Sequence, residues 1–323
     1  MIDQFGRTID YLRISIIDRC NLRCRYCTPH EISYIPNDDL LSNDEILRIA
    51  KLATELDITN FKITGGEPLI RQNCVDLIGR LKSLPKVNQV TMTTNGVLLE
   101  HYLDKLVDAG LDAVNISIDT LLDDKYKYLT NYGNISTSYL ISVAEKCIAN
   151  GIKTKINTVL LKINQDEINS IASIASKMPI DVRFIELMPI GVGSLIEGIN
   201  PNIALSSLKK QWPDLYPVNV KLGNGPAHYY SSQYLQGYIG FIDAVSHKFC
   251  EHCNRIRLTS NGYIKPCLCY DSSVDILSNL RTGVSDDILI NILYKTIYEK
   301  PHFHCFSDNH KITEEKNMIQ IGG

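Results

Sequence analysis

The stretch Leu12-Arg-Ile-Ser-Ile-Ile-Asp-Arg-Cys20-Asn-Leu-Arg-Cys24-Arg-Tyr-Cys27 joins an apolar, β-prone run to three closely spaced cysteines. Thiolates separated by three and then two residues can converge on one soft metal centre, because a short loop returns each sulfur to the same side. Structural zinc sites normally have four protein ligands, whereas three ligands leave a coordination position open. The spacing therefore favours an iron–sulfur cluster with one free iron, with a zinc loop as the alternative.

The composition argues against several classes of protein. With a net charge of −3 over 323 residues, the chain gives no reason to expect a nucleic acid or an anionic membrane as partner. It has no apolar amino-terminal segment and no apolar run of about 18 residues, so neither secretion nor a membrane span is expected. Without a secretory signal, the ten cysteines indicate metal or redox ligands more readily than disulfides, and a cytoplasmic location is expected.

Short apolar runs alternate with amphipathic segments through the first 190 residues. The predicted strands are 12–17, 60–64, 89–94, 113–118, 153–160 and 182–187. The predicted helices are 42–56, 73–84, 99–109, 136–150 and 165–177. This order requires right-handed crossovers and a parallel α/β sheet, either an incomplete barrel or an open doubly wound sheet. In both, the active site lies at the carboxyl ends of the strands.

Three further stretches fall just after predicted strands, namely Gly65-Gly66-Glu67-Pro68, 94–96 and 117–119. Two adjacent glycines let the backbone approach a ligand closely, although a simple tight turn also uses them. Together with the cysteine loop, these stretches predict one shared active site.

Four predicted strands carry a cation in their interior, where a sheltered strand should avoid charge. These residues are Arg13, Lys62, Lys155 and Arg183. One such residue could simply reach solvent at a strand end. Four of them on four strands suggest cations directed into a common cavity, which suits a phosphorylated substrate.

The pattern changes after residue 190, which divides the chain into predicted domains 1–190 and 191–323. Residues 189–202 are predicted to form a long loop, 205–211 a short helix and 229–242 a β-hairpin or meander. The segment 307–316 is polar and predicted to be flexible. The terminal residues Gly322 and Gly323 are either a disordered end or a thin probe able to enter an active site.

A second metal-like constellation lies in this carboxy-terminal part. Cys250 and Cys253 form a C-x2-C pair, and a predicted hairpin over 255–265 would return Cys267 to it. The spacing alone leaves zinc and an iron–sulfur cluster open. A fourth ligand could come from Cys269, His247 or His252.

Taken together, these motifs resemble the GTP 3′,8-cyclase family of radical S-adenosylmethionine (SAM) enzymes, which act in molybdenum-cofactor biosynthesis. The likeness runs from residue 10 to the terminal Gly-Gly. It implies an α/β fold, an incomplete (β/α)6 TIM-like barrel closed by a carboxy-terminal extension that carries a second cluster. It also implies two [4Fe-4S] clusters and SAM as cofactors.

The resemblance assigns roles to residues by position. It implies cluster ligation by Cys20, Cys24, Cys27, Cys250, Cys253 and Cys267, and SAM contacts by Tyr26, Gly66, Ser117 and Met188. It implies GTP contacts by Arg13, Lys62, Thr93, Lys155, Arg255, Ile256 and Arg257. The resemblance also implies catalytic roles for Arg13, Lys155, Arg183, Gly322 and Gly323.

The implied reaction converts GTP to (8S)-3′,8-cyclo-7,8-dihydro-GTP. A radical derived from SAM removes the ribose 3′ hydrogen, and the resulting carbon radical attacks guanine C8. The implied partners are an electron donor and the next enzyme of the pathway, cyclic pyranopterin monophosphate synthase. A monomer and a homodimer are both compatible with the sequence.

Three positions depart from the family pattern. Lys62 replaces an arginine, which would turn a bidentate phosphate clamp into a point charge. Thr28 replaces a methionine, and Cys269 adds a thiol whose ligation would close the second cluster. Two alternative functions remain at this stage: a radical SAM enzyme acting on a peptide or another small molecule, and a zinc-binding scaffold without catalysis.

Overall fold

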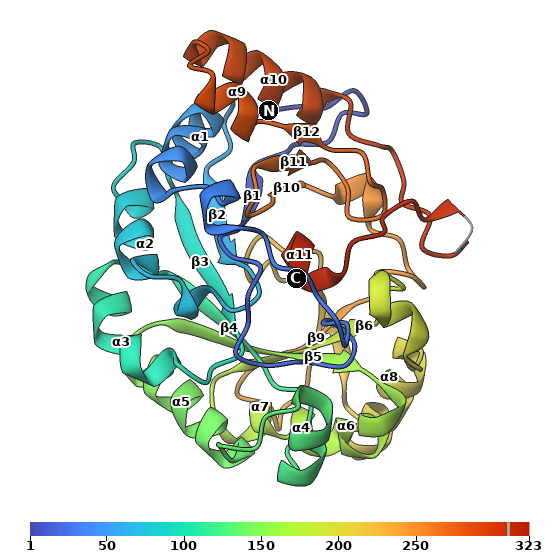
Figure 1. The fold of residues 1–323 in the computed structure, drawn as a ribbon. Helices are drawn as coiled ribbons and strands as arrows, with labels where there is room; N and C mark the ends of the chain where they lie inside the picture. Colours follow the sequence, from blue (N-terminus) through green and yellow to red (C-terminus); the bar gives the residue numbers. More distant parts are fainter. Residues whose placement is uncertain (309–310, 323) are drawn as a thin grey trace.

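The structure is a computed structural model in which residues 1–308 and 311–322 are described. Within these residues, one 12-stranded sheet curves into an open barrel that is ringed by helices (Figure 1). The strands are β1 (Tyr11–Ser15), β2 (Asn60–Thr64), β3 (Gln89–Thr94), β4 (Ala113–Ser117), β5 (Lys153–Leu160), β6 (Asp181–Glu186), β7 (Tyr216–Val218), β8 (His228–Ser231), β9 (Ile239–Ile242), β10 (Arg255–Leu258), β11 (Tyr263–Lys265) and β12 (Val274–Asp275). Their order in the sheet is β12-β11-β10-β1-β2-β3-β4-β5-β6-β9-β8-β7.

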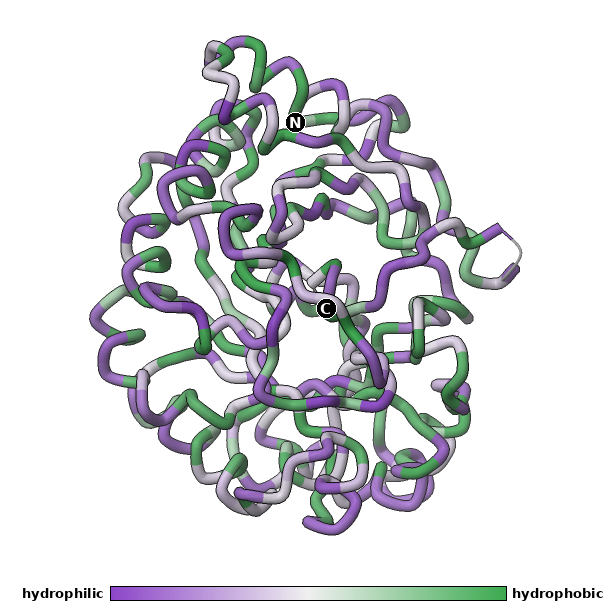
Figure 2. Tube along the Cα trace, in the orientation of Figure 1, coloured by the Kyte–Doolittle hydropathy of each residue, from purple (hydrophilic) through white to green (hydrophobic). Residues whose placement is uncertain are grey.

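All helices except α11 form the outer layer, and most of them follow a strand. They are α1 (Asn43–Glu55), α2 (Cys74–Lys82), α3 (Leu99–Asp108), α4 (Asp123–Thr130), α5 (Thr137–Ala149), α6 (Ile168–Ala172), α7 (Ile174–Lys177), α8 (Pro201–Gln211), α9 (Leu277–Arg281), α10 (Asp286–Tyr298) and α11 (Met318–Ile321). Hydrophilic and hydrophobic residues alternate along this outer layer, as expected for helices with one buried face (Figure 2). In α1, Ser42 and Glu45 form the predicted capping box, which satisfies free N–H groups of the first turn. No helix of the described part is long and apolar enough to cross a bilayer.

The first six strands are parallel and neighbour one another in chain order. The carboxy-terminal residues extend this sheet at both edges, because β9 pairs in parallel with β6 and β10 pairs in parallel with β1. The predicted α/β fold, a partial barrel with a carboxy-terminal extension, is therefore confirmed. The proposed boundary at residue 190 remains a prediction, and residues on both sides of it share one continuous sheet.

Side chains on each strand alternate between two environments, as the pleat requires. Apolar residues such as Leu12, Phe61 and Phe184 face the helices and are fully buried in the main core. Their polar neighbours face the inside of the barrel. The register places Arg13 beside both Lys62 of β2 and Arg257 of β10, so the predicted strand cations come together.

Two features of the fold differ from the sequence predictions, and two predicted hairpins are confirmed. The helix predicted over 165–177 is broken into the 3₁₀ helix η3 (Lys162–Glu167) and the short helices α6 and α7. The polar helix α4 was not predicted, because only Tyr126, Leu129 and Thr130 of its residues are buried and they form a weak apolar stripe. The predicted hairpins over 229–242 and 255–265 are confirmed as the antiparallel pairs β8–β9 and β10–β11.

Candidate active site

The barrel encloses a cavity of about 600 Å³, which is large enough for a nucleotide or a drug-sized ligand. Its lining runs from Cys20 and Gly66 at the carboxyl ends of the strands to Gln89 and Lys153 at their amino ends. Both predicted cysteine triads border this one cavity. The structure therefore joins the two metal-like motifs in a single site.

The first triad occupies the loop after β1, and Cys20, Cys24 and Cys27 all line the cavity. The loop is fixed by a turn in which the Cys27 N–H donates to the Cys24 carbonyl at 3.0 Å. The N–H of Leu22 donates to Cys20 Sγ at 3.3 Å. Three free thiols on one ordered loop fit a four-iron cluster with an open position.

The two glycines after β2 are required by close approach to this cysteine loop. A Cβ on Gly65 would lie 2.6 Å from the Ile17 carbonyl oxygen, and one on Gly66 would lie 2.1 Å from that of Arg19. The Gly66 N–H donates to the Ile17 carbonyl at 2.7 Å. The glycine pair thus packs against the backbone that leads to Cys20 and is more than an isolated turn.

The fully buried Glu67 fastens this glycine segment to the end of β3. Its carboxylate accepts hydrogen bonds from the Leu69 N–H (3.1 Å), the Thr94 hydroxyl (2.8 Å) and the Asn95 N–H (2.8 Å). Burial raises the pKa of the Glu67 carboxyl to about 7, although these hydrogen bonds oppose the rise. Asn95 in turn donates to Cys20 Sγ at 3.6 Å, so the hydrogen-bond network of Glu67 extends to the first triad.

We expect Glu67→Gln to loosen this connection. The amide group replaces one acceptor oxygen with a donor, so a buried N–H of Leu69 or Asn95 loses its partner, at a cost of about 1–3 kcal/mol of folding free energy. Thermal and urea unfolding of the cluster-loaded protein should show the loss, and Glu145→Gln, an exposed position on α5, serves as the control. Equal unfolding curves for the two variants would contradict this role.

The cavity wall beside the first triad contains a tyrosine held by a carboxylate. Tyr26 donates from its hydroxyl to Asp119 Oδ2 at 2.7 Å, and Asp119 Oδ1 accepts from the Val159 N–H at 2.8 Å. Burial raises the pKa of Asp119 to about 6. The sequence predicts only that Asp119 lies at the end of a strand. Its contact with Tyr26 depends on the fold.

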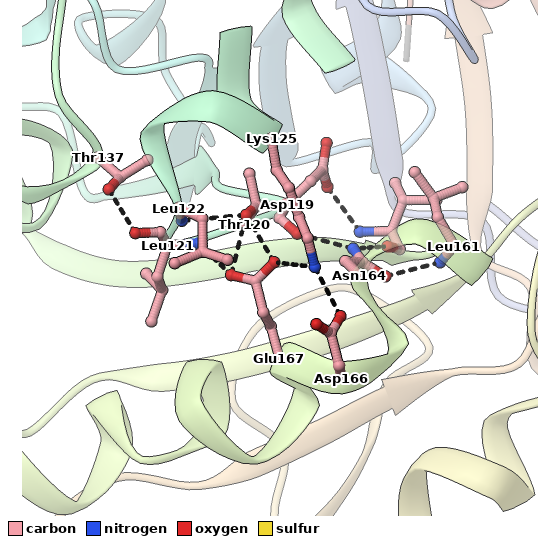
Figure 3. Close-up of polar contacts among 11 residues, drawn as sticks. Asp119, Thr120, Leu121, Leu122, Lys125, Thr137, Leu161, Asn164, Asp166 and Glu167 are labelled. Carbon is pink, nitrogen blue, oxygen red and sulfur yellow. Dashed lines mark hydrogen bonds and ion pairs between the residues drawn. The ribbon is translucent and has the colours of Figure 1, made fainter. Parts of the chain in front are cut away.

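A polar network behind this wall fixes the loops after β4 and β5 to each other (Figure 3). The fully buried Asn164 donates to the Asp119 carbonyl at 2.7 Å, and its Oδ1 accepts from the Leu161 N–H. Glu167 accepts from the Thr120 hydroxyl at 2.8 Å and forms an ion pair with Lys125 at 3.1 Å. These contacts make the support of Asp119 rigid.

The predicted cations converge on the middle of the cavity, which is lined by Arg13, Lys62, Lys155, Arg183, Arg255 and Arg257. Burial and the neighbouring cations hold the pKa values of Lys62 and Arg257 well below their usual values. So many cations in one buried space repel one another. A bound polyanion would relieve that repulsion.

Lys155 has a defined position within this group. Its Nζ lies 2.6 Å from Asp181 Oδ2 and 5.4 Å from the ring centre of Tyr229. Burial lowers the pKa of Lys155, the Asp181 carboxylate opposes this effect, and Arg183 and Lys153 add to it. Asp181 therefore helps keep Lys155 charged.

We expect Asp181→Asn to shift the alkaline limb of the pH–rate profile to lower pH. Removing the carboxylate charge lowers the pKa of Lys155 further, so the ammonium group loses its proton earlier as pH rises. The asparagine oxygen can still accept from the Tyr238 N–H, as Asp181 Oδ1 does now. Asp166→Asn, which removes an exposed carboxylate paired with Lys125, should leave the profile unchanged.

The second triad lies at the same cavity, where Cys250, Cys253 and Cys267 all contribute to the lining. The 3₁₀ helix η5 (Cys250–His252) forms the turn of the C-x2-C pair, and the β10–β11 hairpin returns Cys267 to it. Arg255 Nη2 lies 3.9 Å from Cys253 Sγ. Three thiols facing a common cavity fit a second cluster with an open position.

The proposed fourth ligands do not join this triad. Among the described residues, the cavity lining includes none of Cys269, His247 and His252. Cys269 is fully buried with its Sγ 2.8 Å from Cys305 Sγ, and His247 lies 3.3 Å from Asp243. None of the three candidates is therefore placed to act as a fourth ligand beside Cys250, Cys253 and Cys267.

Arg7 also shapes this end of the cavity and was missed by sequence reasoning. It is buried, forms an ion pair with Asp3 at 2.6 Å, and donates to the Cys250 carbonyl at 3.0 Å. It also donates to the carbonyls of residues 300–302. A single arginine outside any periodic segment gives no sequence signal for such a role.

The carboxy-terminal tail enters the barrel, and α11 lies inside the ring of helices in Figure 1. The Gly322 carbonyl accepts a hydrogen bond from Arg257 Nη1 at 2.8 Å, which places this glycine beside the cavity cations. Glu314 is buried in an ion pair with Lys265, so the expectation of a flexible 307–316 segment is wrong at Glu314. The predicted role of Gly323 lies outside the described residues.

Most predicted ligand-contacting side chains line the cavity, and Ile256 is the exception. Tyr26, Gly66, Thr93, Ser117 and Met188 are part of the lining. Ile256 is fully buried on the outward face of β10, between two arginines that face inward. Its side chain cannot contact a ligand in the cavity, so only its backbone could fill the assigned role.

Comparison with known proteins identifies the class to which this fold and site belong. Residues 14–175 match the Radical SAM superfamily, and residues 180–306 match the Molybdenum Cofactor Synthesis C family. The crystal structure of Streptococcus suis SuiB bound to S-adenosylmethionine is similar in fold, with a TM-score of 0.62 and 16% identity. The structural match covers 90% of this chain and 68% of the SuiB chain.

The relatives define the class more closely. The GTP 3′,8-cyclase of Clostridium perfringens (strain SM101 / Type A) is 44% identical over 325 residues, which cover 100% of both chains. That of Petrotoga mobilis (strain DSM 10674 / SJ95) is 42% identical over 329 residues, again covering 100% of both. The chain belongs to the GTP 3′,8-cyclase family. It is a radical SAM enzyme of molybdenum-cofactor biosynthesis, with SAM and [4Fe-4S] clusters as cofactors.

Proposed function

We propose that this cavity converts GTP to (8S)-3′,8-cyclo-7,8-dihydro-GTP, with the two cysteine triads at its ends and the cations between them. The observation that supports this proposal most strongly is that one cavity is bordered by both triads and by a group of cations that includes Arg13, Lys62, Lys155, Arg183, Arg255 and Arg257. A nucleoside triphosphate has a polyanionic part for the cations and a base for the second triad. An electron donor and the next pathway enzyme are proposed partners.

Cys20, Cys24 and Cys27 would hold the first cluster, and Tyr26, Gly66, Ser117 and Met188 would contact SAM beside it. When bound, this cofactor pair supplies the radical that removes the ribose 3′ hydrogen. Glu67 fixes the glycine segment and Asp119 fixes Tyr26, so both contacts would hold the cofactor pair in place. Holding the reacting groups in a fixed geometry lowers the barrier of the reaction.

Arg13, Lys62, Lys155 and Arg183 would neutralise the triphosphate. Lysine at position 62 binds a phosphate as a point charge, and the nearby arginines supply the bidentate geometry that it lacks. Cys250, Cys253 and Cys267 would hold the second cluster, whose open position would take the guanine. Arg257 would bridge substrate and tail, since it already donates to the Gly322 carbonyl.

The reaction can be tested with anaerobically reconstituted protein, SAM and dithionite, with and without GTP. We expect GTP-dependent formation of 5′-deoxyadenosine and of a cyclised nucleotide, both followed by mass spectrometry. Formation of 5′-deoxyadenosine without a cyclised nucleotide would favour another small molecule or a peptide as the substrate. Neither product from protein with intact clusters would contradict the proposal.

A further inference from the structure

Two cysteines that the proposed reaction does not use meet behind the second triad. Cys269 Sγ lies 2.8 Å from Cys305 Sγ, and the Cys305 N–H donates to Cys269 Sγ at 3.2 Å. Cys269 is fully buried, whereas 9% of Cys305 is exposed. They belong to a small apolar cluster, separate from the main core, that also contains Ile190, Phe306 and Ile321.

Each of the two thiols belongs to a segment that shapes the cavity. Cys269 follows the triad member Cys267 by two residues, and Cys305 follows His304, which lines the cavity. Beyond Cys305, the chain continues to the tail that reaches Arg257 through the Gly322 carbonyl. A covalent bond between the thiols would therefore join the loop of the second triad to the base of the tail.

We propose that Cys269 and Cys305 are a redox-active pair that forms an intramolecular disulfide. In this step the two thiols lose two protons and two electrons while one Sγ–Sγ bond forms. A low-molecular-weight disulfide receives them by thiol–disulfide exchange and leaves as two thiols. Cys305, the more accessible of the two thiols, attacks the small disulfide first and releases one thiol. Cys269, already in contact, then attacks the Cys305 sulfur of the mixed disulfide and releases the second thiol.

The pairing has a consequence for the second triad in either redox state. Cys269 lies close enough in sequence to Cys267 to compete as a fourth thiolate ligand. Its contact with Cys305 directs it away from the cavity. The pair thus keeps the second triad at three thiolates, and its oxidation adds a covalent hold on the tail.

The test uses anaerobic, cluster-loaded protein treated with diamide, an azo compound that accepts two electrons and two protons from a pair of thiols. The reaction is quenched with N-ethylmaleimide during denaturation, and the disulfides are mapped by mass spectrometry while iron content is followed. Cys74 and Cys147, which are equally buried but have no thiol neighbour in the described part of the chain, are internal controls. Cys305→Ser is the matched variant.

We expect a Cys269–Cys305 linked peptide, about 2 Da lighter than its two thiol peptides, to form before iron is lost and to disappear on reduction. Amide exchange over residues 311–322 should slow by about tenfold or more in the oxidised protein, because the tail opens less often. Cys305→Ser should abolish both effects. Persistence of free Cys269 and Cys305, or a first linkage to Cys267 or Cys250, would overturn the proposal.

Discussion

Lys155→Met should reduce the rate of GTP cyclisation by about 100-fold or more, while SAM binding is retained. Lys155 is buried in the cavity and held at 2.6 Å from Asp181, so its ammonium group occupies a fixed position among the cations. Methionine keeps the length of the side chain and removes the charge. Because the charge would act on the triphosphate, most of the loss should appear in kcat/KM for GTP.

Lys153 provides a matched control for this variant. It lies two residues earlier on β5 and also lines the cavity, but it is exposed at the amino end of the strand. Lys153→Met should therefore change the rate by no more than a few-fold. Circular dichroism and iron content would establish that both variants are folded and loaded. Similar rates for Lys155→Met and the parent would contradict the assigned role.

Gly322→Ala should lower cyclisation by about tenfold or more without removing either cluster. Gly322 has a φ of +91°, and a Cβ there would lie 2.6 Å from the Ser15 Cβ. An alanine is strained at this φ and has no space, so the tail must move. Arg257 would then lose the carbonyl that it now contacts at 2.8 Å.

Gly151→Ala is the control for Gly322→Ala, because it introduces the backbone strain of a positive φ without a steric clash. Gly151 has a φ of +78°, but no atom lies within 4 Å of the position of its Cβ. That variant should lose about 1 kcal/mol or more of folding free energy and keep its activity. A second change, Ser15→Gly, should partly rescue Gly322→Ala by making room. Equal activity for the two glycine variants would contradict the role of the tail.

The strands could be predicted because local pattern and global fold agree in them. The bounds predicted for β2, β3 and β5 are confirmed to the residue, since each is a β-prone run of five to eight residues flanked by helices. The convergence of the strand cations also followed from sequence. A buried charge on a strand is costly, so four of them imply a shared cavity and ligand.

Other features depend on contacts that no local pattern contains. The Tyr26–Asp119 hydrogen bond joins residues 93 positions apart, and Arg7 contacts Cys250 over 243 positions. Glu314 looked like part of a polar, flexible segment because its partner Lys265 comes from a distant strand. Ile256 was assigned by position, whereas strand alternation places its side chain on the other face from the cavity.

We propose that the cavity holds GTP with its ribose beside the first triad and its base at the second. The most direct measurement uses GTP deuterated at C3′, with mass spectrometry of the 5′-deoxyadenosine and the nucleotide product. We predict that one deuterium moves to 5′-deoxyadenosine and that the cyclised nucleotide loses it. Unlabelled 5′-deoxyadenosine formed together with the cyclised nucleotide, or a nucleotide that keeps its deuterium, would contradict this arrangement.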